Sequence, residues 1–209
     1  MTLQNRVSPL SEIAANGERG LLMGNRGILH DAHQRLGRAR WRHKNWVCCL
    51  LSFKNRHRRV MTPNHYTELF FLDEAVALAA GHRPCAECRR ADYLTYQHAW
   101  QTATGSSANA RSLDAALHLA RIDGHGQKHH SASAESLPDG TFILIDQSAH
   151  LLAGDQAHPY APGGYTASIP RPQGIVSVVT PAPSVAAMAA GYRPQLHPSA
   201  RLSSALHPA

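Results

Sequence analysis

The stretch that decides the fold runs Phe70-Phe-Leu-Asp-Glu-Ala-Val-Ala-Leu-Ala-Ala-Gly-His-Arg-Pro-Cys-Ala-Glu-Cys-Arg89. Residues 68–72, which overlap the start of this stretch, predict a short strand. Asp73 then supplies a side-chain cap for a helix over residues 74–80, which Gly81 ends. The order of strand, helix, glycine and cysteine pair predicts a compact unit whose cysteine turn opens a second helix.

Cys85 and Cys88 form a Cys-x-x-Cys pair, which directs two thiol groups at one point. The N-terminus of the following helix and the neighbouring arginines favour the thiolate over the thiol. Tetrahedral zinc needs two further ligands, and the other cysteines are Cys48 and Cys49. Neighbouring residues of a strand face opposite sides, so at most one of these two reaches the metal easily unless the strand bulges.

We therefore predict a Zn²⁺ site formed by Cys48, Cys49, Cys85 and Cys88, with a histidine as the alternative for the fourth ligand. The histidines that could serve are His30, His33, His43, His57 and His65. A redox dithiol and two structural thiols without a metal are the competing interpretations. A redox pair normally follows a strand in a βαβ unit, a context that this sequence does not indicate.

The chain has 209 residues, of which 43% are hydrophobic, so it can bury a core without disulfides. No apolar run reaches the roughly 18–20 residues of a membrane span, and the N-terminus has no apolar signal core. With four cysteines and no export signal, we expect a reduced, cytoplasmic protein. Collagen, coiled coils, disulfide-rich secreted domains and membrane proteins are excluded.

Positive charge is concentrated in the first part of the chain. Residues 1–130 contain 18 Lys and Arg against 10 Asp and Glu, whereas residues 131–209 contain 3 against 4. Between Asp31 and Glu68 there are nine basic residues and no acid. Because such a stretch repels itself unless a polyanion relieves it, we expect a nucleic-acid partner, with a solvated surface as the alternative. The expected contacts are Arg40, Arg42, Lys44, Lys54, Arg56, Arg58, Arg59, Arg89 and Arg90, with Trp46 or Trp41 stacking on bases.

The pattern of elements predicts an α+β fold built on a small zinc-stabilised module of β-hairpin and helix, with a further β-rich C-terminal part. We expect a loosely ordered lead-in over residues 1–19 and a basic zinc module over 20–130, with a hairpin at 46–61. A small β-rich part over 131–194 and a frayed tail over 195–209 follow. Residues 189–194, Ala-Ala-Gly-Tyr-Arg-Pro, repeat residues 79–84 at a shift of 110, which indicates a degenerate repeat without the cysteines.

The segment around residues 46–90 resembles the N-terminal zinc-binding module of Ada-type DNA-repair (methylphosphotriester) proteins. The resemblance rests on the Phe-Phe strand, the Ala-rich helix and the Gly-x-Arg-Pro-Cys-x-x-Cys run. It implies a zinc ion on four cysteines, contact with the DNA backbone, and alkyl transfer to one ligand cysteine, for which Cys49 or Cys48 is the candidate. The first pair of that family is Cys-x-x-x-Cys, and here Ser52 stands at that spacing from Cys48.

The function we expect is zinc-dependent binding of nucleic acid in repair or processing, with DNA as the favoured nucleic acid. The alternative is a zinc-containing nuclease or glycosylase with a His-rich site at His129 and His130, where His125 and Lys128 also lie. A nucleic-acid deaminase is a weaker alternative, because the upstream His65-Tyr-Thr-Glu68 differs by one residue from the required spacing. The sequence leaves the oligomeric state and the occurrence of catalysis open.

Overall fold

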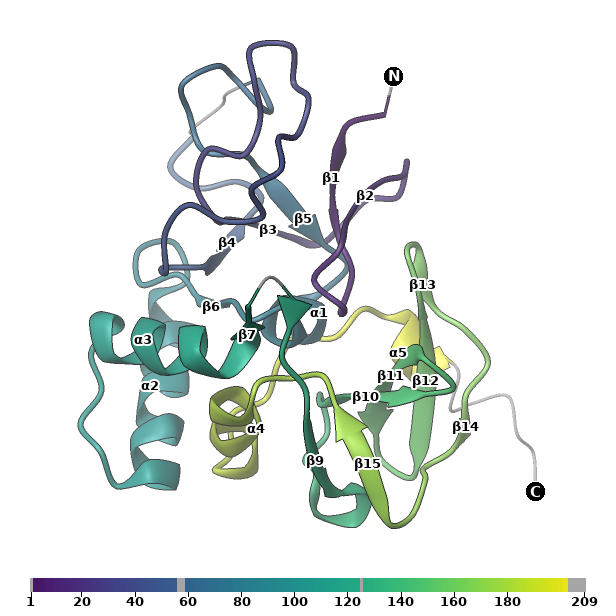
Figure 1. Ribbon diagram of the computed structural model, residues 1–209. Coiled ribbons are helices and arrows are strands. Elements are labelled where there is room, and N and C mark those ends of the chain that lie inside the picture. Colours follow the sequence, from purple (N-terminus) through teal and green to yellow (C-terminus); the bar gives the residue numbers. More distant parts are fainter. Residues whose placement is uncertain (1, 56–58, 125, 203–209) are drawn as a thin grey trace.

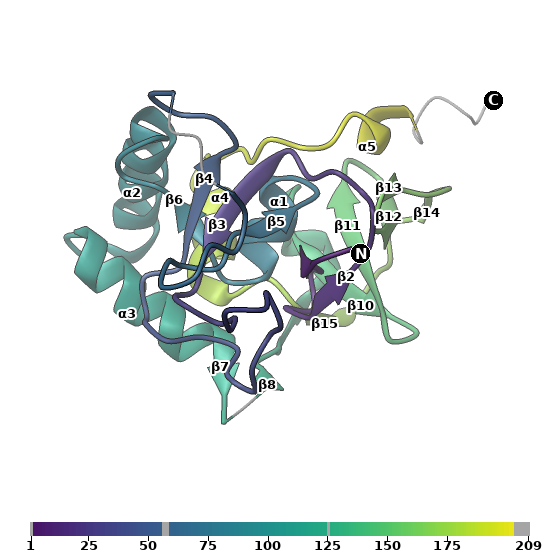
Figure 2. The same ribbon diagram turned by 90° about the horizontal axis from the view of Figure 1, so that it is seen from above.

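The computed structural model describes residues 2–55, 59–124 and 126–202, and Figures 1 and 2 show it from two sides. The fold is mixed α+β, as expected, with two main sheets. In Figure 1 the short helix α1 lies between the two sheets, and the longer helices α2 and α3 lie to one side of it. The helices are α1 Glu74–Ala79, α2 Arg90–Thr104, α3 Ala110–Arg121, α4 Ala182–Ala189 and α5 Ser199–Leu202, with a 3-10 turn at Ala134–Ser136.

The first sheet has the strand order β2-β1-β5-β3-β4-β6. Most neighbours run antiparallel, but β5 is parallel to β1 and β6 is parallel to β4. The glycine-flanked segment expected as a strand is β3, which pairs with both β4 and β5. The strands are β1 Gln4–Val7, β2 Ile13–Ala15, β3 Leu22–Asn25, β4 Val47–Leu50, β5 Leu69–Phe71 and β6 Arg83–Pro84.

Two expectations about this sheet are corrected. The hairpin at residues 46–61 does not form, because β3 rather than residues 59–61 pairs with β4. Residues 51–55 and 59–68 form irregular chain instead. The expected lead-in contributes β1 and β2, whose apolar residues Val7 and Ile13 are buried in the same core as α1.

The second sheet has the order β13-β12-β11-β10-β15-β9, with β14 beside β12. A hairpin joins β10 to β11, with Asp146 and Gln147 at positive φ in its two-residue turn. The strands are β9 His130–Ser133, β10 Phe142–Ile145, β11 Ser148–Ala153, β12 Gln156–Ala161, β13 Gly164–Tyr165, β14 Ile169–Pro170 and β15 Ile175–Val178, and β7 Ile122–Asp123 and β8 Gly126–Gln127 form a separate pair.

The main hydrophobic core joins both sheets through α1, because every residue of that helix is buried. As predicted, Asp73 caps this helix by accepting a hydrogen bond from the backbone NH of Val76 at 2.9 Å. Tyr93, Tyr96 and Trp100 of α2 lie in a second core cluster, so they are packing residues. The arrangement leaves the outer face of the first sheet, around β3 and β4, open to the surroundings.

None of the helices in the part of the chain that the structure describes is both long enough and apolar enough to cross a membrane.

Candidate metal centre

The site begins with strand β4, which lies between β3 and β6 in the first sheet. Alternation along this strand places Cys48 on the buried face and Cys49 on the outer, half-buried face. In the pairing register, Cys49 lies opposite Met23, and Met23 in turn lies opposite Phe70 of β5. One transverse row of the sheet therefore brings these three side chains to the same face.

The second element of the site is the turn between β6 and α2. The backbone NH of Cys85 donates to the carbonyl of Cys48 at 2.9 Å, which attaches the start of the turn to β4. The backbone NH of Arg89 donates to the carbonyl of Cys85 at 3.1 Å and closes the turn, after which α2 begins. Cys85 and Cys88 are thereby held beside the strand that carries Cys49.

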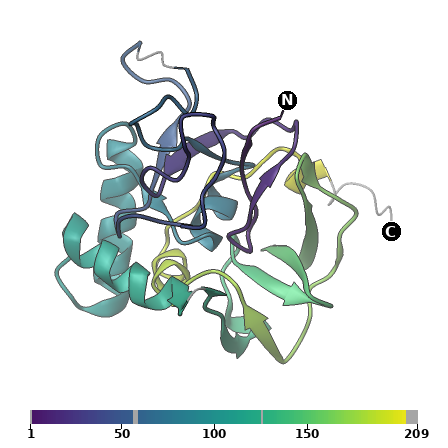
Figure 3. The ribbon, with the colours of Figure 1, turned by 45° about the horizontal axis from the view of Figure 1, so that its top comes forward.

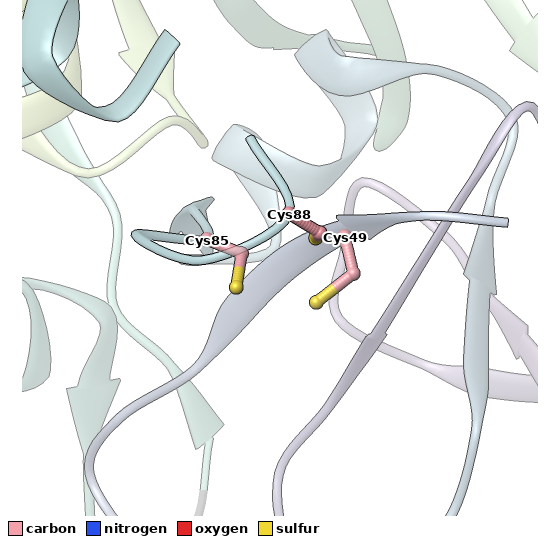
Figure 4. Close-up of side chains that lie close together, drawn as sticks. All are labelled: Cys49, Cys85 and Cys88. Carbon is pink, nitrogen blue, oxygen red and sulfur yellow. The ribbon is translucent and has the colours of Figure 1, made fainter. Parts of the chain in front are cut away.

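The sulfurs of Cys49, Cys85 and Cys88 all lie within 4.8 Å of one another. Figure 4 shows Cys85 and Cys88 extending from the turn beside strand β4, which carries Cys49. Zinc–sulfur bonds of about 2.3 Å place tetrahedral ligand sulfurs roughly 3.8 Å apart, a spacing that lies within this limit. The three cysteines can hold a metal ion, and their arrangement is compatible with zinc.

The thiols of the cluster interact strongly. Hydrogen bonds from Cys49 and then Cys88 lower the pKa of Cys85, and the same interaction with Cys85 raises the pKa of Cys49. The backbone NH of Glu87 also donates to the sulfur of Cys85 at 3.4 Å. One negative charge is thus shared by three thiols, and a bound divalent cation would favour the thiolate form of all of them.

Cys48 is not part of the cluster, which corrects its predicted role as a ligand and as a nucleophile. Its side chain is fully buried on the opposite face of β4, and its sulfur accepts a hydrogen bond from Arg89 Nη1 at 3.6 Å. Burial, followed by the nearby charge of Glu74, raises the pKa of Cys48, so this group stays a thiol. As strand alternation predicted, only one of the two adjacent cysteines joins Cys85 and Cys88.

A pocket of about 490 Å³ opens directly on the cluster, and all three cysteines line it. The sheet supplies Met23, Asn25 and Phe70 to its wall, and the chain between β4 and β5 supplies Phe53, Tyr66 and Glu68. The carboxylate of Glu68 is buried and accepts a hydrogen bond from the backbone NH of Met61 at 2.7 Å. Sequence reasoning missed this pocket, because its signal is strand alternation combined with a pairing register that only the structure supplies.

The exposed basic residues of the acid-free stretch occupy two irregular segments, residues 26–46 and the described parts of the chain between β4 and β5, residues 51–55 and 59–68. In Figures 1 and 3 these segments extend together from the same side of the first sheet. The second segment belongs to the pocket wall, so part of the charge lies beside the metal centre. The exposed members are Arg35, Arg38, Arg40, Arg42, Lys44, Lys54 and Arg59, whereas Arg56 and Arg58 lie outside the described residues.

Two of the predicted nucleic-acid contacts are corrected. Trp46 is 1% exposed, and the guanidinium groups of Arg26 and Arg121 lie 4.1 and 3.8 Å from its ring centre, so no base can reach it. Arg89 is also buried, in ion pairs of 2.9 Å with Glu74 and Asp92.

Arg90 is exposed, so its contact with nucleic acid stays a prediction. Trp41 is half-buried and lines a second hollow of about 470 Å³ with Arg38, Ala39 and Arg40. It replaces Trp46 as the indole that a base can reach.

His129 precedes β9 and His130 begins it; both are half-buried, and Figure 1 shows β9 apart from β4 and β6. Burial lowers the pKa of both imidazole rings, so each is a weaker base than an exposed histidine. Among the described residues they form no group with a third metal-binding side chain, and His125 lies outside those residues. The described residues therefore give no metal-binding group at this place, and the predicted His-rich site stays a prediction.

Comparisons of this chain with protein-family models, with curated proteins and with solved structures give no match, so the functional conclusion depends on the geometry of the site.

Proposed function

We propose that this chain binds one zinc ion through Cys49, Cys85 and Cys88. We further propose that the adjoining basic segments bind nucleic acid in repair or processing, with DNA as the favoured nucleic acid. The observation that carries the proposal is the convergence of three sulfurs, from residues far apart in sequence, within 4.8 Å. The cluster adjoins the acid-free basic stretch, which supplies part of the pocket wall.

Zinc is the metal that this donor set favours. Cysteine thiolates are soft ligands, and three of them at one point suit Zn²⁺ far better than Mg²⁺ or Ca²⁺, which take oxygen ligands. The turn that carries Cys85 and Cys88 opens a 15-residue helix, whose N-terminus favours thiolate charge. The exposed positive charge of Lys54 and Arg59 also lies on the segment that borders the cluster.

Nucleic acid is the partner that the surface charge favours. Nine basic residues without an acid between Asp31 and Glu68 give a one-signed surface that phosphate groups neutralise. The hollow formed by Arg38, Ala39, Arg40 and Trp41 offers guanidinium groups together with an indole face. Both features are common in proteins that bind single strands.

The test is the salt dependence of binding to a fluorescent single-stranded DNA. The double variant Arg38→Ala, Arg40→Ala should weaken binding and reduce the slope of log K against log salt by about 1.4, or about 0.7 for each phosphate that is no longer neutralised. The matched control is Arg111→Ala, an exposed arginine of α3 outside the basic segments. An unchanged slope in the double variant would show that these arginines do not bind phosphate, and absence of salt-dependent binding in the wild type would overturn the function.

A second candidate is a zinc enzyme that modifies nucleic acid, and the pocket favours it. A zinc ion on three protein ligands beside a pocket has the ligand count of catalytic sites. Mass spectrometry of oligonucleotides incubated with the zinc protein tests this candidate. A mass change that disappears in Cys49→Ser would support modification, and an unchanged mass would leave binding as the function.

A further inference from the structure

We propose that the pocket beside the three cysteines receives a single nucleobase turned out of a strand, with one edge of the base at the open fourth position of the metal. This inference rests on the proposed function and names the part of the nucleic acid that its site recognises. It joins three features of the pocket: an incomplete ligand set, aromatic walls, and a donor and an acceptor on the side chains that line it.

The first feature is the incomplete ligand set. A tetrahedral ion held by Cys49, Cys85 and Cys88 needs one more ligand, and within residues 2–55, 59–124 and 126–202 no fourth ligand atom joins the cluster. All three cysteines line the pocket. An ion held by these three cysteines would therefore lie at the wall of the pocket, where water or a ligand atom could complete its ligand set.

The second feature is the size and the wall of the pocket. Its volume of about 490 Å³ falls within the roughly 300–1,000 Å³ of small-ligand sites. Phe53, Tyr66 and Phe70 contribute aromatic rings from both sides, the loop and the sheet. Aromatic rings stack on any base, because every base has a π-face. A flat heterocycle is thus the class of ligand that this wall suits.

The third feature is a pair of polar side chains, Asn25 and Glu68. Asn25 contacts Nε2 of His43 through its Oδ1 at 3.1 Å, so its amide nitrogen supplies the donor. Glu68 brings a carboxylate, an acceptor, to the same pocket. Base edges present donors and acceptors side by side, and one donor with one acceptor can orient such an edge.

Positive charge flanks the lining residues along the chain, whereas the charged residues of the lining itself are Glu68 and Glu87. Lys54 follows Phe53 directly, and Arg59 precedes Val60, another lining residue. Both basic side chains are exposed, so phosphate groups on either side of an inserted base meet positive charge. Leu50 and Leu51, 39% and 53% exposed, supply an apolar rim past which a base can enter.

The first arm of the test compares two single-stranded DNAs of equal length, one with normal bases and one entirely abasic. The wild-type zinc protein should bind the base-bearing strand about tenfold more tightly. Phe53→Ala should reduce this preference to the part that stacking on Trp41 contributes, and should keep the salt dependence of binding to the backbone. Leu119→Ala, an apolar truncation at a residue 75% exposed on α3, is the matched control and should retain the preference.

The second arm uses Co²⁺-substituted protein and free nucleosides, and it needs no variant to fold. Binding at the open position should shift the visible d–d bands of the cobalt centre in a saturable manner. Equal affinity for normal and abasic strands, or a cobalt spectrum that nucleosides leave unchanged, would overturn the pocket assignment. In that case salt-dependent strand binding would preserve the proposed function, whereas its absence would overturn both.

Discussion

The two Ala-Ala-Gly-x-Arg-Pro segments, residues 79–84 and 189–194, end their helices in the same way. In each, the glycine has a positive φ, +83° at Gly81 and +105° at Gly191, and donates to the carbonyl three residues earlier. The next residue, His82 or Tyr192, donates to the carbonyl five residues earlier. This pair of hydrogen bonds is the Schellman cap, which requires the glycine and no particular function.

The segments differ in the path of the chain after the proline. After residue 84 the chain turns and brings Cys85 and Cys88 to Cys49. After residue 194 it returns to α1, where the backbone NH groups of Gln195 and His197 donate to the carboxylates of Glu74 and Asp73 at 2.9 and 2.8 Å. The same helix ending thus leads to the cluster of three cysteines in one case and to a contact that ties the C-terminal segment to α1 in the other.

Metal removal should produce the largest contrast between the two regions. We expect chelation, or Cys85→Ser, to destabilise the protein by several kcal/mol, because metal binding adds directly to folding free energy. Hydrogen exchange should accelerate in residues 47–50 and 83–88 and change little in residues 142–153. Uniform acceleration of exchange through both sheets would show that the two regions unfold together and would contradict the expected difference between them.

Glu74→Ala should have the next largest effect, on the side of the structural contact. The carboxylate pairs with Arg89, whose side chain is 3% exposed, and it also accepts hydrogen bonds from Tyr192 and from the backbone of Gln195. Removing one partner of a buried ion pair costs about 3–5 kcal/mol. Denaturant unfolding should show this loss while the zinc content stays that of the wild type, and Glu12→Ala, at an exposed glutamate, is the control.

His82, the residue after Gly81, makes the first region sensitive to acid. Burial, followed by the charge of Arg26, holds the pKa of His82 well below its usual value of 6.5. The unfolded chain therefore binds a proton below about pH 6.5 that the folded protein does not, so the free energy of unfolding falls as the pH decreases. The contribution reaches about 1.4 kcal/mol per pH unit.

His82→Gln should reduce this slope, measured by urea unfolding between pH 7 and 5 in the presence of zinc. The difference between wild type and variant cancels the pH dependence of metal binding itself. His98→Gln is the matched change at an exposed histidine. Identical slopes in the wild type and His82→Gln would contradict the assigned protonation state.

Tyr192→Phe should give the smallest effect, because it removes one hydrogen bond of 2.5 Å to Glu74 and leaves the ion pair with Arg89 in place. A loss of about 1 kcal/mol is expected from thermal or urea unfolding. A loss as large as that of Glu74→Ala would mean that the hydroxyl, rather than the ion pair, holds the C-terminal contact.

Local signals in the sequence predicted much of the first region. The side-chain cap at Asp73, the glycine stop at Gly81 and the cysteine turn each act within a few residues, and the structure contains all three. Strand alternation also predicted that one of the two adjacent cysteines, Cys48 or Cys49, would miss the metal. Short-range backbone preferences determine such features, so one sequence is enough to find them.

Long-range pairing was the part that the sequence did not reveal. The hairpin expected at residues 46–61 competes with the pairing of β4 and β3, and the choice depends on tertiary packing that local propensity does not encode. The burial of Trp46 and Arg89 follows from the same packing, because their partners Arg121 and Glu74 are distant in sequence. The proposed nucleic-acid surface therefore rests on Trp41, Arg90 and the exposed loop cations.

The most decisive experiment on the metal centre is the zinc content of the purified protein and of four single Cys→Ser variants. We predict about one zinc per chain in the wild type and in Cys48→Ser, because that thiol faces Arg89 on the buried side of β4. We predict loss of the ion in Cys49→Ser, Cys85→Ser and Cys88→Ser. Zinc retained in Cys49→Ser and lost in Cys48→Ser, or no zinc in the wild type, would contradict this assignment of the ligands.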